Sequence, residues 1–481
     1  MREASLFEVS WSELKDEDEQ RQGVVHKRQN CKDARHPACS TLECAGPAAQ
    51  WSMPGDLDLH RLKVLGGIAC YCFTGQSGAR PPHSKGTVQS MNVIKRVTRC
   101  LLMITVVAVC CSTIALAQTA KRVNAKAPAE VIAELQKLLS DEVAGTPSLP
   151  GELLHVQAPR QGIDVSLAAG VFDRESKQPL DPHHVFRVAS VTKTFVAAAI
   201  LRLYEDGKIK LDDPINHYLP QEYNTILDKG GYPSNVITVR QLLTHTSGMF
   251  DYARAKQYYE IISANPKHRW TRKEQVEDAI IWGTPRAAPG KEYDYSDTGY
   301  VLLGEMLERL TGKSLGSALR SLLNFKKLKL DETYLETLEP TPAGIKPLAH
   351  PYFGEIDAVD FDPSVDLYGG GGLVSSVEDL ARFYRALVQG KIFQRDSTLQ
   401  MMLTVPPTNN DAAGGPYAMG IQRRHIAGNV CWGHNGFWGT SAYHCPDIDV
   451  TIVRHYNQAQ PNGLIFKTLY EQIGKSLLIA N

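Results

Sequence analysis

The sequence has no excess of charge of either sign. Lys+Arg and Asp+Glu both number 52, so the formal net charge is zero, and no long run of like charge interrupts the chain. A polyanion or an anionic membrane surface attracts a protein through a basic excess, which this chain does not have. We therefore expect no nucleic-acid partner. The hydrophobic fraction of 43% is that of an ordinary folded globular protein.

Cysteine is scarce in most of the chain. Of the ten cysteines, only Cys431 and Cys445 lie beyond residue 111. The early cysteines lack the paired C-x-x-C spacing of a zinc site. The adjacent His183 and His184 do not suggest a metal pair either, because neighbouring side chains on an extended segment point apart. We expect no metal and no organic cofactor.

Residues 91–117 have the three-part pattern of a secretory signal peptide. A basic start after Met91 is followed by an apolar run from Leu101 and by the small-residue site Ala115-Leu116-Ala117. An uncleaved membrane anchor is the alternative, since the apolar run approaches the length that spans a bilayer. We expect cleavage before Gln118 and export to the periplasm or the medium. No stable membrane partner is then expected.

Residues 1–90 have no sustained hydrophobic period and read as mixed polar coil. Because a signal peptide belongs at a start codon, we interpret Met91 as the true start and residues 1–90 as a non-native or disordered extension. The working domain would then be residues 118–481. N-terminal sequencing of the exported protein tests this interpretation, and a mature start within residues 1–90 would contradict it.

Hydrophobic spacing predicts helices and strands at both ends of the remaining chain. Apolar residues at helical spacing predict helices over residues 128–144, 190–205 and 464–479. Alternation around a turn near Pro159 predicts a hairpin within residues 151–173. The long middle, in which short helical patterns alternate with Pro/Gly loops, suggests a mostly helical lobe inserted into an α/β lobe, with a cleft between them.

A further helix is expected after the glycine run Gly369–Gly372. Ser375 and Glu378 fit a capping box at its start. Its buried face is expected to consist of Leu380, Phe383, Tyr384 and Leu387. The glycines themselves indicate tight backbone packing, because no Gly-Lys-Ser/Thr follows to make a phosphate loop.

Ser190 and Lys193 form the first candidate for chemistry. A serine hydroxyl is a poor nucleophile at neutral pH and needs a neighbouring base. Three residues apart on a helix, the two side chains share one face, with Cβ atoms about 5–6 Å apart. By itself the spacing is weak evidence for catalysis, since a solvated helix lysine is the commoner explanation for such a residue.

Two later motifs strengthen this candidate. Tyr295-Ser296-Asp297 stands just before an apolar helix, and His434-Asn435-Gly436 stands on an expected strand. In this order the motifs resemble the penicillin-recognising serine hydrolases, which comprise class C β-lactamases, serine D-alanyl-D-alanine carboxypeptidases and related esterases. The resemblance covers residues 128–480 and implies an α/β fold, with an antiparallel sheet flanked by helices and the active site at the cleft.

The resemblance also implies catalytic roles. Ser190 attacks a carbonyl and becomes acylated, while Lys193 supports removal of its proton. Tyr295 exchanges that proton with Ser190 and later with the leaving group or water.

For substrate binding, the resemblance implies that His434 orders Tyr295 and any substrate carboxylate. The Phe437 amide is expected to join that of Ser190 as the oxyanion hole. Gly436 lacks a side chain and would let substrate lie close to the strand.

Asp297 departs from the family pattern, which has Asn at this place. An amide both donates and accepts hydrogen bonds, whereas an ionised carboxylate only accepts. Asp297 could hold Lys193, but its charge opposes a Tyr295 phenolate. This weakens the case for an efficient β-lactamase and favours esters, or peptides that offer an N–H or a cation.

Cys431 and Cys445 would face each other if the segment between them turns about Trp438. Opposed cysteines in an exported protein could form a disulfide, although the strand register is not fixed by the sequence.

The leading interpretation is an exported serine hydrolase that works through an acyl-enzyme on an ester, a D-amino-acid peptide or a β-lactam. The partner would be a small-molecule or peptidoglycan-type substrate. The alternatives are a peptidoglycan D-alanyl-D-alanine carboxypeptidase and a non-catalytic penicillin-binding-like module.

Overall fold

The computed structural model describes residues 126–412, 415–459 and 470–477, so the expected signal peptide and residues 1–90 lie outside the described residues. The strands of the described part are β1 (Gly151–Ala158), β2 (Ile163–Gly170), β3 (Phe186–Arg187), β4 (Tyr334–Leu335), β5 (Tyr352–Phe353), β6 (Ile356–Asp357), β7 (Leu373–Ser375), β8 (Gln422–Ile426), β9 (Asn429–Asn435), β10 (Thr440–Cys445) and β11 (Val450–Tyr456). The helices are α3 (Pro128–Gly145), α4 (Thr192–Glu205), α5 (Gln221–Lys229), α6 (Val239–Leu243), α7 (Lys256–Ala264), α8 (Arg272–Trp282), α9 (Asp297–Thr311), α10 (Leu315–Leu322), α11 (Phe325–Leu328), α12 (Val377–Val388) and α13 (Asp396–Met402).

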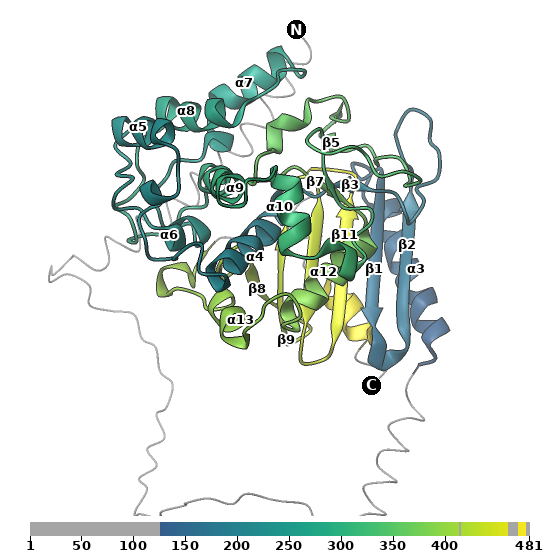
Figure 1. Ribbon diagram of the computed structural model, residues 1–481. Helices are drawn as coiled ribbons and strands as arrows, with labels where there is room; N and C mark the ends of the chain where they lie inside the picture. The colour runs from purple at the N-terminus through teal and green to yellow at the C-terminus, as the bar shows by residue number, and fades with distance from the viewer. Residues whose placement is uncertain (1–125, 413–414, 460–469, 478–481) are drawn as a thin grey trace, which may run out of the picture. The chain divides into compact units, whose positions relative to one another are not determined.

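The main sheet is assembled from both ends of the described chain. Its six strands lie in the order β2-β1-β11-β10-β9-β8, and every neighbouring pair is antiparallel. The predicted hairpin is confirmed as β1 and β2, joined by a short 3₁₀ turn at Pro159–Gln161. Pairing of β1 with β11 brings the first and last strands side by side (Figure 1). The sequence between β2 and β8 therefore forms an insertion.

Helices cover both faces of this sheet. Strand residues alternate between the two faces, so that Leu153 packs with α12 and α4, while its neighbour Leu154 packs with α3. The helix predicted over residues 128–144 is confirmed as α3. The antiparallel sheet with flanking helices confirms the expected fold class. Among the described residues, none of the helices combines the length and the apolar character that a membrane crossing requires.

The predicted buried face of α12 is confirmed, but the predicted cap is wrong. The four expected residues Leu380, Phe383, Tyr384 and Leu387 are fully buried. The helix is capped by Ser376, whose hydroxyl accepts from the Asp379 amide. The difference arises because β7 extends through Ser375, so that the helix begins one residue later than the capping box requires.

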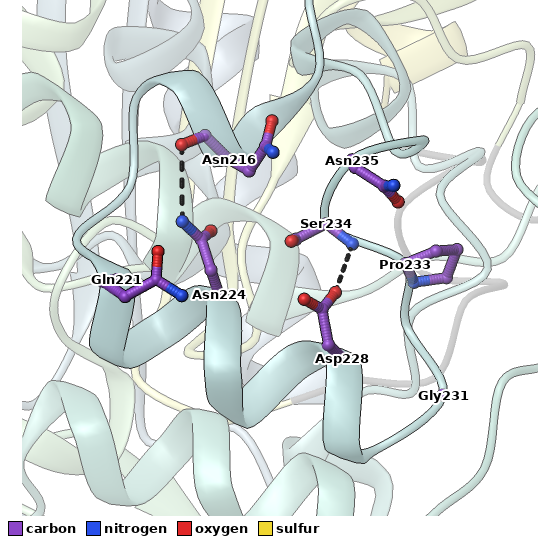
Figure 2. A pocket seen from close by; sticks show the side chains of 8 residues that line it. All are labelled: Asn216, Gln221, Asn224, Asp228, Gly231, Pro233, Ser234 and Asn235. Carbon is purple, nitrogen blue, oxygen red and sulfur yellow. Dashed lines mark hydrogen bonds between the residues drawn. The ribbon is translucent and has the colours of Figure 1, made fainter.

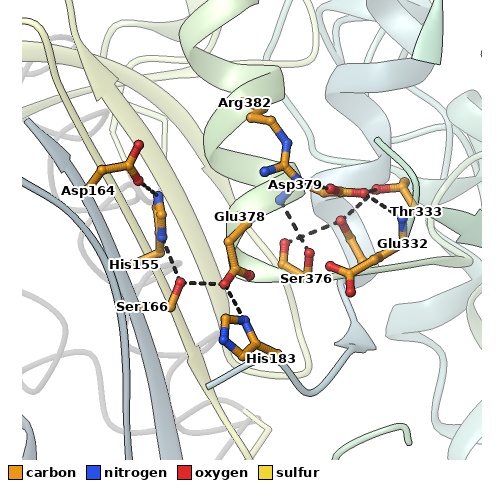
Figure 3. A network of polar contacts seen from close by, with 11 residues as sticks. His155, Asp164, Ser166, His183, Glu332, Thr333, Ser376, Glu378, Asp379 and Arg382 are labelled. Atoms are coloured by element: carbon orange, nitrogen blue, oxygen red, sulfur yellow. Dashed lines mark hydrogen bonds and ion pairs between the residues drawn. The ribbon is translucent and has the colours of Figure 1, made fainter. Parts of the chain in front are cut away.

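Glu378 instead joins α12 to the β1–β2 hairpin (Figure 3). Its Oε1 accepts from the Ser166 hydroxyl at 2.5 Å and lies 2.8 Å from His183 Nδ1. His184 turns to a different partner, since its Nδ1 donates to the Pro347 carbonyl. The two histidines thus point apart. The described ranges contain no cluster of three or more His, Cys, Asp or Glu side chains that could hold a metal ion.

The helical insertion surrounds α4, which runs through the main hydrophobic core. Every residue of α4 from Thr192 to Leu201 is buried. The predicted helix over residues 190–205 is confirmed, with a 3₁₀ turn at Ala189–Val191 before its first α-helical residue. Helices α9, α10 and α13 pack on α4, as does the 3₁₀ turn itself. The turn that carries Ser190 also contacts β9 and β10, so it lies between the sheet and the insertion.

The register of β9 and β10 is the one expected for a turn about Trp438. Asn435 pairs with Ser441, and Gly433 pairs with Tyr443. Cys431 and Cys445 form a disulfide in this register. Of the closing helix expected over residues 464–479, the described residues 470–477 are helical, and the rest lies outside the described ranges.

We expect His455 to make the folded protein sensitive to acid. The ring is fully buried and stacks on Phe186 at 4.0 Å, and burial lowers its pKa from 6.5 to about 3. Between these values the unfolded chain binds a proton that the folded chain does not, so stability falls as the pH falls. Relative to His455→Phe, the wild type should lose about 1.4 kcal/mol per pH unit in this window.

Urea unfolding of wild type and His455→Phe at several pH values measures this difference. The variant also loses the contact of His455 Nδ1 with the Thr440 hydroxyl at 3.1 Å, which changes the free energy of unfolding by the same amount at every pH. This constant difference is subtracted before the pH dependence of the two proteins is compared. A stability difference that does not change between pH 6.5 and pH 3 would contradict the prediction.

Candidate active site

Ser190 lies in a strained turn at the start of α4. The preceding residue, Ala189, has φ of +47°, a left-handed conformation that is costly for a residue with a Cβ atom. The Val188 amide donates to the Leu373 carbonyl at 2.9 Å, which holds the turn to β7 of the three-stranded sheet formed by β3, β7 and β4. Ser190 itself is partly exposed, whereas Ala189 and Val191 are buried. The local backbone therefore presents the Ser190 hydroxyl to solvent from an otherwise buried segment.

Lys193 is a fully buried cation, and not a solvated helix lysine. Its Nζ donates to Ser190 Oγ at 3.0 Å and to the Gly370 carbonyl at 2.6 Å. It also forms an ion pair with Asp297, the residue that departs from the family pattern. Three partners thus compensate for the loss of water around the ammonium group. The structure brings Ser190, Lys193 and Asp297 together as the sequence motifs predict.

Two further carboxylates interact with the Lys193 charge. Burial, followed by repulsion from Asp297, raises the pKa of Asp251 to about 7, and attraction by Lys193 opposes this shift. The same causes raise the pKa of Asp366 to about 7. Arg254, which forms an ion pair with Asp251 at 3.8 Å, lowers the pKa of Asp251 more than Lys193 does, and Arg187 also lowers that of Asp366. Sequence reasoning missed Asp251 and Asp366.

The glycine run Gly369–Gly372, which directly precedes β7, packs closely against two of these carboxylates. A Cβ atom on Gly371 would lie 1.9 Å from Asp366 Oδ1, and one on Gly370 would lie 3.3 Å from Asp297 Cβ. Tight backbone packing, as expected from the sequence, is thus the role of Gly370 and Gly371. The same approach carries the Gly370 carbonyl to Lys193.

Tyr295 lies beside both Ser190 and Lys193. Lys193 Nζ is 4.9 Å from the centre of the Tyr295 ring, and the neighbouring Ser190 hydroxyl lowers the pKa of the Tyr295 phenol. Burial, followed by the charge of Asp297, raises the pKa of the phenol well above its ordinary value. The Tyr295 hydroxyl is therefore neutral at physiological pH. Asp297 opposes a phenolate here, as expected from the sequence.

His245 holds the chain on both sides of Tyr295. Its carbonyl accepts from the Asp294 amide at 2.9 Å, and its Nδ1 accepts from the Ser296 amide at 3.1 Å. The ring centres of His245 and Tyr295 are 4.2 Å apart. Burial, followed by the charge of Lys193, lowers the pKa of His245, so the ring stays neutral and Nδ1 remains an acceptor. Sequence reasoning missed this residue too.

His434 is buried, and both of its ring nitrogens form hydrogen bonds with groups other than Tyr295. Its Nδ1 donates to the Asn435 carbonyl at 2.6 Å, so Nε2 accepts from the Tyr417 hydroxyl at 2.9 Å. Burial, followed by the charge of Lys193, lowers the pKa of His434 to about 3. The ring is neutral, and its centre lies 6.5 Å from that of Tyr295. These contacts differ from the role that the resemblance implied, in which His434 orders Tyr295 and meets a substrate carboxylate.

Gly436 is required by a contact within the protein. A Cβ atom at this position would lie 2.2 Å from the Val188 carbonyl oxygen and 3.3 Å from Ala189 Cβ. The glycine therefore lets the end of β9 approach the turn that carries Ser190, and the expectation that it makes room for substrate is not needed to explain it. Phe437 follows directly and is partly buried, with its ring 5.8 Å from Phe353. The Phe437 amide stays a predicted oxyanion donor.

Comparisons with known proteins agree with this arrangement. The family described as Beta-lactamase matches residues 156–471. The chain is similar to penicillin-binding protein 4* of Bacillus subtilis (strain 168), at 26% identity over 56% of this chain and 59% of that protein. It is also similar to esterase EstB of Burkholderia gladioli, at 34% identity over 32% of this chain and 40% of that protein. The chain thus spans about two fifths to three fifths of the length of these curated relatives.

A solved structure gives the same result over a longer stretch. The D-stereospecific amidohydrolase from Streptomyces sp. matches with a TM-score of 0.59 and 28% identity, and the match covers 69% of this chain and 97% of that chain. The fold and the family match together place the chain in the family of β-lactamase-fold serine hydrolases. Because the family model matches more than half of the chain, this protein belongs to the β-lactamase family. The resemblance inferred from the sequence motifs is confirmed.

Proposed function

We propose that the protein is an exported hydrolase that forms an acyl-enzyme at Ser190. Once the Lys193–Tyr295 pair has lost one proton to solvent, Ser190 Oγ attacks the substrate carbonyl and its proton passes to that pair, which then protonates the departing oxygen or nitrogen. A water molecule attacks the acyl carbon, gives a proton to the same pair and releases the acid, and Ser190 regains its proton. The proposal is supported by the 3.0 Å contact of Lys193 Nζ with Ser190 Oγ and by the Tyr295 ring, whose centre lies 4.9 Å from the same Nζ.

We further propose that the substrate carries a cation near its reacting carbonyl, as an α-amino ester or amide does. The observation that carries this proposal is the Asp297 carboxylate, which pairs with Lys193 and raises the pKa of Tyr295, with the buried carboxyl groups of Asp251 and Asp366 near it. A substrate ammonium at Asp297 would offset the negative charge that raises the pKa of Tyr295. Binding of the correct substrate would then favour proton transfer through Tyr295.

The carboxypeptidase alternative has less support. A substrate with a free C-terminal carboxylate needs a cation or a free donor to receive it. His434 stands at the family position for this task, but it is neutral and its Nε2 is taken by Tyr417. The names of two similar proteins, an esterase and a D-stereospecific amidohydrolase, agree with an ester or amide substrate.

Intact-mass measurement separates these candidates. The purified protein is treated with a fluorophosphonate and, separately, with a fluorescent penicillin, and the adduct mass is followed over time. An adduct from the fluorophosphonate alone favours the ester or amide hydrolase. A long-lived penicillin adduct favours a carboxypeptidase, and a short-lived one a β-lactamase. No adduct from either reagent, with Ser190→Ala indistinguishable from wild type, would favour the non-catalytic module.

Asp297→Asn should reverse the substrate preference. The amide removes the charge that would hold a substrate ammonium and supplies the donor that the carboxylate lacks. We expect kcat/KM for a D-alanine ester to fall about tenfold relative to that for its N-acetyl derivative, and acylation by penicillin to rise. Steady-state kinetics with the matched pair of esters measures the first change, and intact mass the second.

The exposed Asp360 provides the control, because it pairs with Lys267 on the surface at 3.1 Å. Asp360→Asn should leave both measurements unchanged. If Asp297→Asn treats the free and acetylated esters as wild type does, the proposed cation preference is wrong, although Ser190 could still be the nucleophile.

A further inference from the structure

An aromatic pair, Phe353 and Phe437, stands next to Ser190 on the side of the main sheet. A Cβ atom on Gly436 would lie 3.3 Å from Ala189 Cβ, so the turn between β9 and β10 abuts the turn that carries the nucleophile. Phe437 is the next residue after this contact, and its ring stacks on that of Phe353 with ring centres 5.8 Å apart. Both phenylalanines are partly exposed, as is Ser190. Apolar rings in this position can contact a substrate.

The turn between β9 and β10 holds Phe437 in place. The Gly439 amide donates to the Gly436 carbonyl at 3.1 Å, and the Gly436 amide donates to the Thr440 carbonyl at 2.7 Å. These bonds close a tight turn with Phe437 at its tip. The next residue, Trp438, is buried, and its ring packs edge-on against that of Phe437 with ring centres 4.9 Å apart. The buried indole therefore supports Phe437 from the core side.

Phe353 comes from the β5–β6 hairpin, which is attached to the end of β11 (Figure 1). The Tyr352 amide donates to the Asn457 carbonyl at 3.2 Å, and the Tyr352 carbonyl accepts from the Ala459 amide at 2.6 Å. The β9–β10 turn also packs on this stretch, since a Cβ atom on Gly439 would lie 2.7 Å from the carbonyl oxygen of residue 458. The two segments that carry the aromatic pair thus meet at one end of the sheet.

Arg187 joins the same hairpin to the turn of the nucleophile. It is buried and stands three residues before Ser190 in the sequence. Its guanidinium group donates to the Ala358 carbonyl at 2.8 Å and to the Phe361 carbonyl at 3.3 Å, just after β6. The Glu336 carboxylate accepts from the same group at 2.8 Å and balances its charge. The hairpin is therefore fixed on the side of Ser190 as well as at β11.

The pocket beside α5 offers no comparable apolar contact. Figure 2 shows that carboxamide, hydroxyl and carboxylate groups surround it. The described residues that line it include no aromatic ring. An apolar substrate group therefore finds its partner in the aromatic pair and not in this pocket.

We propose that Phe353 and Phe437 bind the side chain of the residue that acylates Ser190, and that the substrate is an ester or amide of an aromatic or large aliphatic α-amino acid. This inference rests on the proposed acyl-enzyme function and on its cationic substrate. The substrate ammonium would meet Asp297, which begins α9 in the insertion. The side chain leaves the same tetrahedral carbon in another direction, and the aromatic pair lies on the opposite, sheet side of the Ser190 turn.

The ethyl esters of D-phenylalanine and D-alanine test the proposal, because they share the ammonium group and the leaving group and differ only in the side chain. We expect the wild type to prefer the phenylalanine ester by about tenfold in kcat/KM. Phe353→Ala should lower this preference about fivefold, whereas Phe353→Tyr keeps the ring and should retain it. Since Phe353→Ala could disturb folding, Phe353→Leu provides a second test, with the preference about twofold lower.

Glu355→Gln is the matched control on the same hairpin, because Glu355 is exposed and pairs with Arg174 at 3.2 Å. Both esters carry the same charge, so this change should leave the preference at its wild-type value. If Phe353→Ala loses activity equally toward both esters, Phe353 only holds the β9–β10 turn, and the proposal is overturned. Equal kcat/KM of the wild type for the two esters would also overturn it, with the proposed function intact. Hydrolysis of neither ester would contradict the proposed function itself, and this inference would fall with it.

Discussion

Lys193→Met is expected to lower kcat/KM for an activated ester by about 10³-fold and to destabilise the folded protein by about 3–5 kcal/mol. Activity falls because Nζ is the group within 3.0 Å of Ser190 Oγ that can take part in proton transfer. Stability falls because Lys193 is fully buried and is the ion-pair partner of Asp297. Ester kinetics and urea unfolding measure the two effects separately.

The double variant Lys193→Met/Asp297→Asn distinguishes these effects. Removing the carboxylate together with its counter-ion leaves no uncompensated charge at the pair, so most of the lost stability should return. Activity should not return, because the double variant still lacks an amine beside Ser190. Recovery of activity along with stability would show that Lys193 acts only as a structural counter-ion.

The site could be predicted only as far as short motifs carry it. Ser190 and Lys193 are three residues apart on one helix, so local geometry determines their contact. Tyr295 and Asp297 were placed beside them through family resemblance, since no local rule brings residues from α4 and the start of α9 together. Asp251 and Asp366 belong to short turns whose sequences carry no chemical signature. Their interaction with Lys193 depends on the packing of the insertion.

The fold was likewise predictable where the pattern is local, and not where elements far apart in the sequence pair. Strands β1 and β2 and helix α3 show their periodicity directly, whereas the register of β9 with β10 was a hypothesis about the turn between them, which the structure confirms. The pairing of β1 with β11 joins residues about 300 positions apart, such as Glu152 and Tyr456, and no sequence period encodes it. The cap of α12 was misplaced by one residue for the same reason, because β7 holds Ser375 in the three-stranded sheet with β3 and β4.

The electrostatics of the site follow from burial combined with several close charges. Lys193 is compensated by Asp297, and His434 and His245 remain neutral close to that cation. The charge of Asp297 raises the pKa of Tyr295, and those of Asp251 and Asp366 add to this effect. A free enzyme with this arrangement is poorly suited to form a phenolate. It becomes better suited when a positively charged group enters, which links substrate charge to proton transfer in one step.

His245→Phe is expected to lower kcat for an activated ester by about 10²-fold while KM changes by less than about twofold. Phenylalanine keeps an aromatic ring against Tyr295 but removes the Nδ1 acceptor of the Ser296 amide. The segment that carries Tyr295 then loses one of its two contacts with residue 245, and the phenol shifts relative to Ser190. Because His245 is buried behind Tyr295 and not exposed to a substrate, substrate binding should be little affected. Steady-state kinetics of the purified variant measures both parameters.

His245→Asn is the matched control for this positioning role. The Oδ1 of asparagine occupies nearly the place of histidine Nδ1, so it can accept from the Ser296 amide. Asparagine also tolerates the left-handed conformation of residue 245, which has φ of +54°. We therefore expect His245→Asn to recover most of kcat although the ring is lost. If His245→Asn is as slow as His245→Phe at equal stability, the ring and not the hydrogen bond positions Tyr295, and the role assigned to Nδ1 is wrong.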